Sequence, residues 1–384
     1  MKVTVSTDSL RSGLSTLILD SSISKFNPKS CITRITMVQN TIQLDTEYAD
    51  VKSRLKVDCT ADEDDYRVIY VESSVFKKLI NSLNTGDVTL EITDKDSTTL
   101  VVRAGKSKFL VPQIAEYQDV RFGIDSAEIE DLATLFDNST KFDFSAWKFV
   151  SSYQLYALAD AVSAYKAYTN VYIGEDNSII VGDYNSSLFT YSNKNTVFDS
   201  CMIPGSVVKL LISYPEDSSV ARSENQSDLW YIMCHDENGE YSLVSEFRTK
   251  AETDAENYQS DKIIPLLMHS DESAVTIPNL AAIKDVLAQG SVLVSNKNDY
   301  VINLAVENGK LRVFGNNMEY VENVDDSAEE FTVALRLQRF VDTISHLDSN
   351  EVKIMPKYRK DRNGNEIVFA LILWTENLTV VLGA

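Results

Sequence analysis

One pattern of apolar and polar positions recurs along the chain. In residues 75–92, VFKKLINSLNTGDVTLEI, apolar side chains fall at positions 76, 79, 80 and 83, the spacing of one face of an amphipathic helix. Gly86 and Asp87 then mark a turn, and apolar residues alternate with polar ones up to position 92, as in a half-buried strand. The pattern therefore predicts a helix over 75–84 followed by a strand over 88–92.

The same helix–turn–strand unit returns at intervals of 132 residues. Phe76 corresponds to Val208 and Phe340, and the next turn of the stripe returns as Ile212 and Ile344. Equal spacing indicates a threefold internal repeat, and a repeat architecture decides the fold class. We therefore expect three tandem domains. Their expected ranges are 1–122, 123–264 and 265–384, the second with a longer opening segment over 123–147.

Each expected domain has the same order of elements: strand, helix, strands, helix, strands. Two helices against alternating strands predict an α+β class with antiparallel sheets. The six expected helices span 8–20, 75–84, 148–168, 206–214, 277–289 and 336–347. The main expected strands span 2–5, 32–38, 41–44, 51–57, 66–71, 88–92, 99–102, 108–111, 171–173, 179–181, 188–191, 202–203, 229–233, 241–247, 301–305, 310–313, 331–335, 367–374 and 378–382.

Composition favours a folded, soluble, intracellular protein. Of the 384 residues 44% are hydrophobic and only 7 are proline, which argues against disorder. The cysteines at 31, 59, 201 and 234 show no CxxC spacing, so we expect unpaired buried thiols in a reducing cytoplasm. The chain contains no apolar leader and no membrane-length apolar run, so neither secretion nor membrane insertion is expected.

Catalytic chemistry is not indicated. His235, His269 and His346 lack metal-ligand spacing, and no phosphate-loop, nucleophile-elbow or zinc-protease motif occurs. The acidic run 62–65 and the pair at 325–326 are typical of solvated loops. We therefore expect no enzyme activity, no metal and no cofactor.

Charge is distributed unevenly between element types. The formal net charge of −21 taken alone argues against nucleic-acid binding. Yet the six expected helices hold nine cations and five acids, a net +4 that leaves −25 for strands and loops. The helix cations are Arg11, Lys77, Lys78, Lys148, Lys166, Lys209, Lys284, Arg336 and Arg339. Helix propensity alone would explain lysine and arginine, but glutamate has a similar propensity and is absent from all six segments. The asymmetry favours an anionic partner on the helix side.

Three stretches carry a resemblance to a known family. They are the MKVTV start with its helix, VFKKLINSL…VTLEI followed by LVVRAGKSKFLVPQIAEYQDV, and INLAVENGKLRVFGNNMEYVE…FTVALRLQRFVDTISHLDSNEVKI. Together with three α+β domains and cationic helices on an acidic body, they make the chain resemble the bacterial DNA polymerase III beta-type sliding clamp and its bacteriophage relatives.

The resemblance implies a homodimeric ring of six domains whose helices line a hole around double-stranded DNA. It implies a processivity factor of DNA replication, in the cytoplasm of a bacterium or of a bacteriophage host. The DNA polymerase and the clamp loader would bind this clamp through short peptides. Lys25 and Lys29 would join the helix cations on DNA. The implied dimer interface comprises Phe109, Val111, Leu293 and Val294. The implied partner-peptide pocket comprises Ile173, Leu188, Ile263, Val380, Val381 and Leu382. Each of these apolar residues could equally be ordinary core.

Two stretches depart from the family pattern. The chain stops at VVLGA instead of an apolar-Pro-apolar-Arg-Leu tail, and residues 183–188 read DYNSSL instead of the Asp-Gly-His-Arg-Leu turn. Both put the peptide specificity in doubt. The remaining alternatives are a ring-forming structural or assembly protein and a clamp that serves transcription rather than replication.

Overall fold

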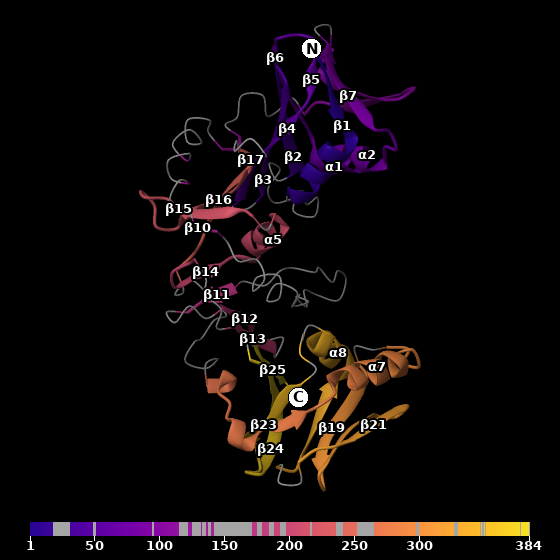
Figure 1. The fold of residues 1–384 in the computed structure, drawn as a ribbon, viewed down its shortest axis with the longest axis vertical. Coiled ribbons are helices and arrows are strands. Elements are labelled where there is room, and N and C mark those ends of the chain that lie inside the picture. Colours follow the sequence, from indigo (N-terminus) through magenta and orange to yellow (C-terminus); the bar gives the residue numbers. More distant parts are fainter. Residues whose placement is uncertain are drawn as a thin grey trace. The chain divides into compact units, whose positions relative to one another are not determined.

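Figure 1 shows the chain in a computed structural model. The structure describes residues 1–17, 31–48, 51–93, 96–114, 122–124, 132, 136, 140–141, 171–174, 179–183, 188–192, 197–215, 217–235, 241–251, 265–296, 299–325, 329–345, 347, 349, 351–376 and 378–383. Two compact units divide the chain. Unit 1 comprises Met1–Phe144 with Ser206–Thr249, and unit 2 comprises Ser145–Gly205 with Lys250–Ala384.

The first repeat lies in unit 1 and follows the expected order of elements. Its elements are β1 (Lys2–Ser6), α1 (Thr7–Thr16), β2 (Ile32–Val38), β3 (Thr41–Tyr48), β4 (Val51–Asp58), the short β5 (Thr60–Ala61), β6 (Tyr66–Glu72), α2 (Ser73–Ser82), β7 (Asp87–Thr93), β8 (Asp96–Ala104) and β9 (Ser107–Pro112). The strands therefore confirm the alternating pattern, mostly with one residue added at one or both ends, whereas β3 and β8 extend further.

The second repeat is shared between the units. Its elements are β10 (Thr140–Lys141), β11 (Val171–Ile173), β12 (Ile179–Asp183), β13 (Leu188–Ser192), β14 (Cys201–Ile203), α5 (Gly205–Ser213), β15 (Ser219–Arg222), β16 (Leu229–His235) and β17 (Tyr241–Arg248). The helix expected at 148–168 and most of the opening segment 123–147 lie outside the described residues.

The third repeat lies in unit 2. After a short 3-10 helix, η4 (Asp271–Ser273), its elements are β18 (Val275–Ile277), α7 (Leu280–Ser291), β19 (Val301–Glu307), β20 (Lys310–Gly315), β21 (Met318–Asn323), β22 (Phe331–Arg336), α8 (Leu337–Ser345), β23 (Val352–Lys360), β24 (Glu366–Trp374) and β25 (Thr379–Gly383).

Sheet topology repeats three times along the chain. In the first repeat the strand orders are β1-β7-β8-β9 and β6-β2-β3-β4. The second repeat gives β10-β15-β16-β17 and β14-β11-β12-β13, and the third gives β18-β23-β24-β25 and β22-β19-β20-β21. Each order has the same connectivity once the strands are counted within their repeat. The α+β class and the threefold repeat are thus confirmed, whereas the exact boundary residues stay a prediction.

The repeated helix buries the stripe that the sequence predicts. Phe76, Val208 and Phe340 are each at most 1% exposed, as are Ile80 and Ile344. The helix ends are alike as well: at α2 and α8 the leucine that follows donates its N–H to an isoleucine carbonyl at 3.2 Å. Burial of one apolar face against the sheets is what stabilises so short a helix.

Helix limits differ from expectation where a cap or a strand intervenes. Helix α1 ends at Thr16, not at 20, since Leu17 is already extended (ψ 136°). Helix α7 begins at Leu280 because Pro278 keeps Ile277 in strand β18, and Asn279 Oδ1 then accepts the N–H of Ala282 at 3.1 Å. Arg336 is the last residue of β22 and not part of α8.

Neighbouring repeats are joined by strand pairing. In unit 1, β4 of the first repeat pairs antiparallel with β17 of the second, and Ser53 lies opposite Ser245 with their hydroxyl oxygens 2.6 Å apart. The Tyr214 hydroxyl donates to Ser245 at 2.6 Å, and its complete burial raises its pKa well above the ordinary value. In unit 2, β13 of the second repeat pairs with β25 of the third. Each junction makes one eight-stranded sheet from two repeats.

Candidate nucleic-acid interface

Helix pairs carry the candidate DNA-binding cations. Helix α1 packs against α2, and α7 packs against α8 (Figure 1). The five helices α1, α2, α5, α7 and α8 hold six of the nine predicted cations, three acids and no glutamate. The segregation of charge therefore persists with the observed helix limits, at a net +3 for these helices.

Two of the six cations each donate a hydrogen bond to a backbone carbonyl oxygen just beyond the neighbouring helix. Arg11 in α1 donates from Nη2 to the carbonyl oxygen of Leu83, just beyond α2, at 2.7 Å. Lys284 in α7 donates from Nζ to the carbonyl oxygen of Leu347, just beyond α8, at 3.0 Å. In both repeats a cation of the first helix thus satisfies a terminal carbonyl of the second. Arg11 also pairs with Asp8 at 2.7 Å, so these cations position helices whatever else they contact.

The remaining helix cations differ in exposure. Lys78 is exposed on α2, on the side opposite the buried Phe76 and Ile80, while Lys77 is half-buried. Arg336 is exposed at the entrance to α8, and Arg339 is half-buried. Lys209 lies in α5. Four of the predicted site residues, Lys25, Lys29, Lys148 and Lys166, lie outside the described residues, as does Ile263 of the predicted pocket.

The predicted interface residues lie on and beside two sheet edges. Strand β9 is the last strand of its sheet and β21 the last strand of another, and neither outer edge pairs with a strand in the described part of the chain. On β9, Phe109 is 36% exposed and Leu110 62% exposed, whereas Val111 is buried. Leu110 was not among the predicted residues. The alternation of side chains along a strand would have predicted Leu110, because it places Leu110 on the face opposite Val111.

The other edge has exposed apolar residues of its own. Leu293 follows α7 and is 64% exposed, while Val294 packs against the core of unit 2. Val321 on β21 is 48% exposed, and β21 itself was not expected from the sequence. The strand reads Met-Glu-Tyr-Val-Glu-Asn, in which Val321 interrupts the alternation that Met318 and Tyr320 begin, so the apolar period gives only a weak sign of it.

Predicted pocket residues lie in one sheet of unit 2. Ile173 is on β11, Leu188 is on β13, and the Val380–Leu382 run is on β25, where Leu382 lies opposite Leu188. Val380 and Leu382 belong to the main core, and each residue of the run is at most 2% exposed. Val381 points to the other face, into a cluster with Tyr172, Leu267 and Trp374. The sequence thus placed these residues on neighbouring strands but could not show which face each one takes.

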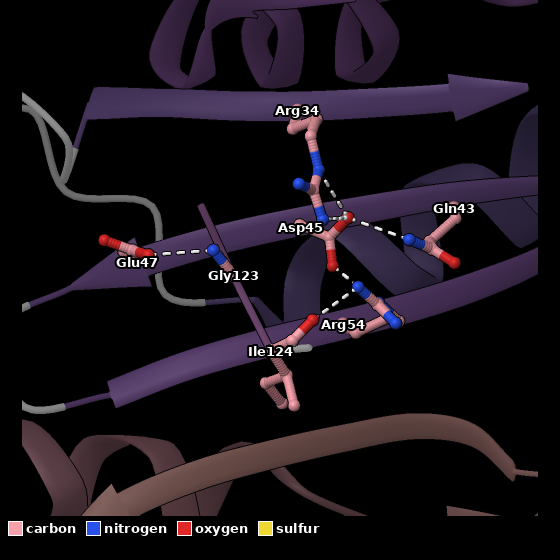
Figure 2. A network of polar contacts seen from close by, with 7 residues as sticks. All are labelled: Arg34, Gln43, Asp45, Glu47, Arg54, Gly123 and Ile124. Carbon is pink, nitrogen blue, oxygen red and sulfur yellow. Dashed lines mark hydrogen bonds and ion pairs between the residues drawn. The ribbon is translucent and has the colours of Figure 1, made fainter. Parts of the chain in front are cut away.

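A buried ionic network fixes the chain where the first repeat ends (Figure 2). Asp45 on β3 is fully buried and accepts from Arg34 Nε and Nη2 at 3.0 and 2.9 Å, from Gln43 at 2.9 Å and from Arg54 Nε at 2.6 Å. Burial tends to lower the pKa of Arg34, but the charge of Asp45 and its hydrogen bond raise that pKa overall. Arg54 also donates to the carbonyl oxygen of Ile124 at 2.6 Å.

The segment 122–124 crosses one face of this sheet and is held at every residue. Phe122 packs edge-on against Tyr70 with ring centroids 6.1 Å apart, and Gly123 donates its N–H to Glu47 at 2.8 Å. Gly123 has φ +76°, and a Cβ there would come within 2.9 Å of Asp45. Only glycine fits this site without strain. No sequence motif predicted this ionic network, because its members are spread from residue 34 to residue 124.

The side chains that could bind a metal ion include the histidines and cysteines. Among the described residues no group of three His, Cys, Asp or Glu side chains is placed to hold a metal ion. His269 stacks on Trp374 with ring centroids 4.4 Å apart and contacts the Leu267 carbonyl through Nδ1, as a structural histidine does. All four cysteines are described and none forms a disulfide, as expected, although Cys31 and Cys59 are only partly buried.

No helix in the described part of the chain is both long and apolar enough to cross a membrane.

Comparison with known proteins defines the fold class. The chain matches no family model and no curated protein. Among solved structures it has the fold of the bacterial DNA polymerase III beta sliding clamp, matched along its whole length.

Three of the similar structures are the Caulobacter crescentus pol III beta, the DNA polymerase III subunit beta from Pseudomonas aeruginosa and the DNA polymerase sliding clamp from Bacillus subtilis. Each gives a TM-score of 0.66 over 100% of this chain and 98–99% of its own, at 13%, 12% and 12% identity respectively. The fold expected from the resemblance is confirmed.

Proposed function

We propose that the chain is a DNA sliding clamp, a processivity factor that encircles duplex DNA as a homodimer and tethers a replicative polymerase. One observation carries the proposal: three topologically equal repeats are joined in series through β4–β17 and β13–β25. Strand β21 of the third repeat corresponds to β4 and β13, and strand β9 of the first repeat corresponds to β17 and β25; these two are left without such a partner in the described chain. A second copy supplies the missing partner at each end, which closes a ring of six repeats.

Chemistry at the two edges supports this closure. Antiparallel pairing of β9 with β21 of a second copy would satisfy their backbone groups, and Phe109, Leu110, Leu293 and Val321 would lose exposed apolar surface. An unpaired strand edge with apolar residues is otherwise an aggregation hazard. A twofold ring of this kind buries two identical interfaces.

The helix cations support DNA as the enclosed partner. Helices with a net positive charge and no glutamate belong to a chain whose other elements are strongly acidic. Because a closed ring holds DNA topologically, weak and salt-dependent contacts to phosphates would suffice and would permit sliding. The acidic remainder would repel DNA from other surfaces. No step of this function needs a catalytic residue or a cofactor.

The sheet around β11, β13 and β25 is the proposed binding region for partner peptides. It includes Ile173 and Leu188 of the predicted pocket, and Tyr172, Leu267 and Val381 form a second apolar cluster on its other face. Residues 183–188 differ from the family's turn, which supports the proposal that this clamp binds partners specific to it. A bacteriophage-encoded clamp in a host cytoplasm would have such partners.

Retention on DNA of different topology tests the proposal. Protein loaded on nicked circular DNA should remain after gel filtration at high salt, and linearising the DNA with a restriction enzyme should release it. Equal loss from the circular and the linear form, with bound protein verified at the start, would contradict encirclement. A ring that neither holds circular DNA nor stimulates a polymerase would instead favour the assembly-protein alternative. Retention without stimulation of a replicative polymerase would favour a clamp for transcription.

A further inference from the structure

The β23–β24 hairpin extends beyond the core of unit 2. Its base is buried, with Val352, Ile354, Leu371 and Leu373 each fully enclosed. From residue 357 to residue 368 every side chain is half-buried or exposed. Strand β23 runs for nine residues from a start close to the end of α8, so its far end lies about 26 Å along the strand. We call residues 357–368 the hairpin tip.

The turn of the hairpin tip is closed by hydrogen bonds. Asp361 Oδ1 accepts the backbone N–H groups of Asn363 and Asn365 at 2.8 and 2.9 Å, and its own N–H donates to the Asn365 carbonyl at 2.8 Å. Gly364 adopts φ +86°, which lets the turn close. A tip ordered in this way presents its flanking side chains in fixed positions.

The hairpin tip is basic in a chain that is otherwise acidic. It holds the cations Lys357, Arg359, Lys360 and Arg362 against two acids, Asp361 and Glu366. The equivalent hairpin ends of the other repeats, 93–96 and 222–228, each hold one cation and two acids. The three repeats share one topology, so they serve as internal controls. Positive charge at this place is therefore not required by the fold.

The cations of the hairpin tip are available to a ligand. Arg359, Lys360 and Arg362 take part in no ion pair with the described residues, whereas Lys353 nearer the base pairs with Asp271 at 2.9 Å. The guanidinium of Arg359 lies 5.4 Å from the ring centre of Phe369, which holds its flat face in place. Tyr358 is 39% exposed and donates its hydroxyl to Glu329 at 2.9 Å, so its ring is also fixed.

We propose that the hairpin tip binds single-stranded DNA. Cations on both sides of the exposed Tyr358 ring suit a single strand, because phosphates take the charges and an unstacked base takes the ring face. Paired bases of a duplex are not available for such stacking. The inference rests on the proposed clamp function: the strand in question would be the unpaired template next to the duplex that the ring encloses. An acidic segment of a protein partner is the competing ligand.

The test compares two fluorescein-labelled DNAs that share one duplex and differ by a 12-nucleotide 5′ overhang. The tip variant R359Q/K360Q/R362Q removes three charges. The matched control K2Q/K106Q/K310Q removes three exposed lysines elsewhere and gives the same net charge. We expect the unmodified protein and the control to bind the overhang DNA more tightly than the blunt duplex in fluorescence anisotropy. The tip variant should lose that difference and keep its affinity for the blunt duplex.

Salt dependence gives a second readout. Three phosphate contacts to a single strand contribute about 2 to the slope of log affinity against log salt, so the tip variant should lose about that much on the overhang DNA only. Tyr358→Phe should bind as the unmodified protein does, and Tyr358→Ser should weaken overhang binding about fivefold or more because a stacking face is lost.

Each other outcome overturns the inference in a recognisable way. Equal affinities of the tip variant and the control on overhang DNA would exclude the tip as a DNA site. Equal loss on both DNAs would exclude a single-strand role. Intact DNA binding with loss of an acidic partner peptide would assign the tip to protein. If the unmodified ring is neither retained on circular DNA nor held by either oligonucleotide, the clamp proposal fails first, and the inference fails with it.

Discussion

At the residue scale, Gly123 shows most clearly how one position supports a junction. Its φ of +76° and the 2.9 Å approach of Asp45 leave no room for a side chain. We expect Gly123→Ala to lower the free energy of unfolding by about 2 kcal/mol or more, since left-handed backbone strain adds to the clash. Urea denaturation followed by tryptophan fluorescence measures the change. Gly86→Ala is the matched control, because a Cβ at that position would meet no atom within 4 Å, and it should change stability little.

The Asp361 turn offers a pH-dependent prediction at the same scale. Hydrogen bonds to the carboxylate, that from the Asn365 N–H first, lower the pKa of Asp361 below its ordinary value of 3.8. A depressed pKa means that the turn gains stability above the unfolded pKa and loses it as the pH falls through the folded pKa. We expect the protection of the Asn365 amide, its exchange rate compared with the intrinsic rate at the same pH, to fall only below about pH 4. An NMR titration in which Asp361 ionises at or above 3.8 would contradict this.

At the element scale, the sequence predicted helices and strands where the apolar period was clear. Strand 32–38 and strand 171–173 have the expected limits, and the helix stripe through Phe76 and Phe340 is buried as expected. The apolar pattern did not predict β21, whose charged and polar residues give a weak alternation. It also did not predict that β23 continues through Pro356 to Lys360. That proline is tolerated because β18 pairs only with residues 352–354, so no ladder bond is lost on that side.

Paired helices give a prediction that separates positioning from DNA contact. Arg11→Gln and Lys284→Gln remove a donor from the carbonyl beyond the second helix of each pair. We expect each to lower stability by about 1–2 kcal/mol. We also expect the salt dependence of duplex binding to stay unchanged, whereas Lys78→Gln should reduce its slope by about 1 without loss of stability. Thermal unfolding and anisotropy titrations at several salt concentrations measure the two effects. A reduced slope for Arg11→Gln at normal stability would assign Arg11 to DNA instead.

At the scale of the whole molecule, the candidate sites show where sequence reasoning ends. The resemblance named Phe109 and Leu293, and both are exposed beside sheet edges. It also named Val111, Val380 and Leu382, which are buried in cores, and periodicity alone could not separate these cases. The Asp45 network and the basic hairpin tip arise from strand neighbours far apart in the chain or from a contrast between repeats. Both become visible only once the topology aligns the repeats.

Ring closure through β9 and β21 is the prediction that the whole topology makes. Leu110→Asp on β9 and Val321→Asp on β21 each place a carboxylate on an exposed apolar position of an edge that a second copy would cover. Because an unpaired buried charge costs several kcal/mol, either change should shift the protein from dimer to monomer at micromolar concentration while the fold is kept. Sedimentation velocity measures the assembly, and circular dichroism checks the fold.

Tyr66→Asp provides the matched control for that experiment, since Tyr66 is 60% exposed on β6, in a sheet that contains neither β9 nor β21, and it should remain dimeric. A dimer that survives both edge substitutions would place the interface elsewhere. Dissociation by only one of them would show that β9 and β21 do not pair with each other, because a head-to-tail ring needs both surfaces in every contact. Loss of the dimer in both should also abolish retention on circular DNA, which ties the strand edges directly to encirclement.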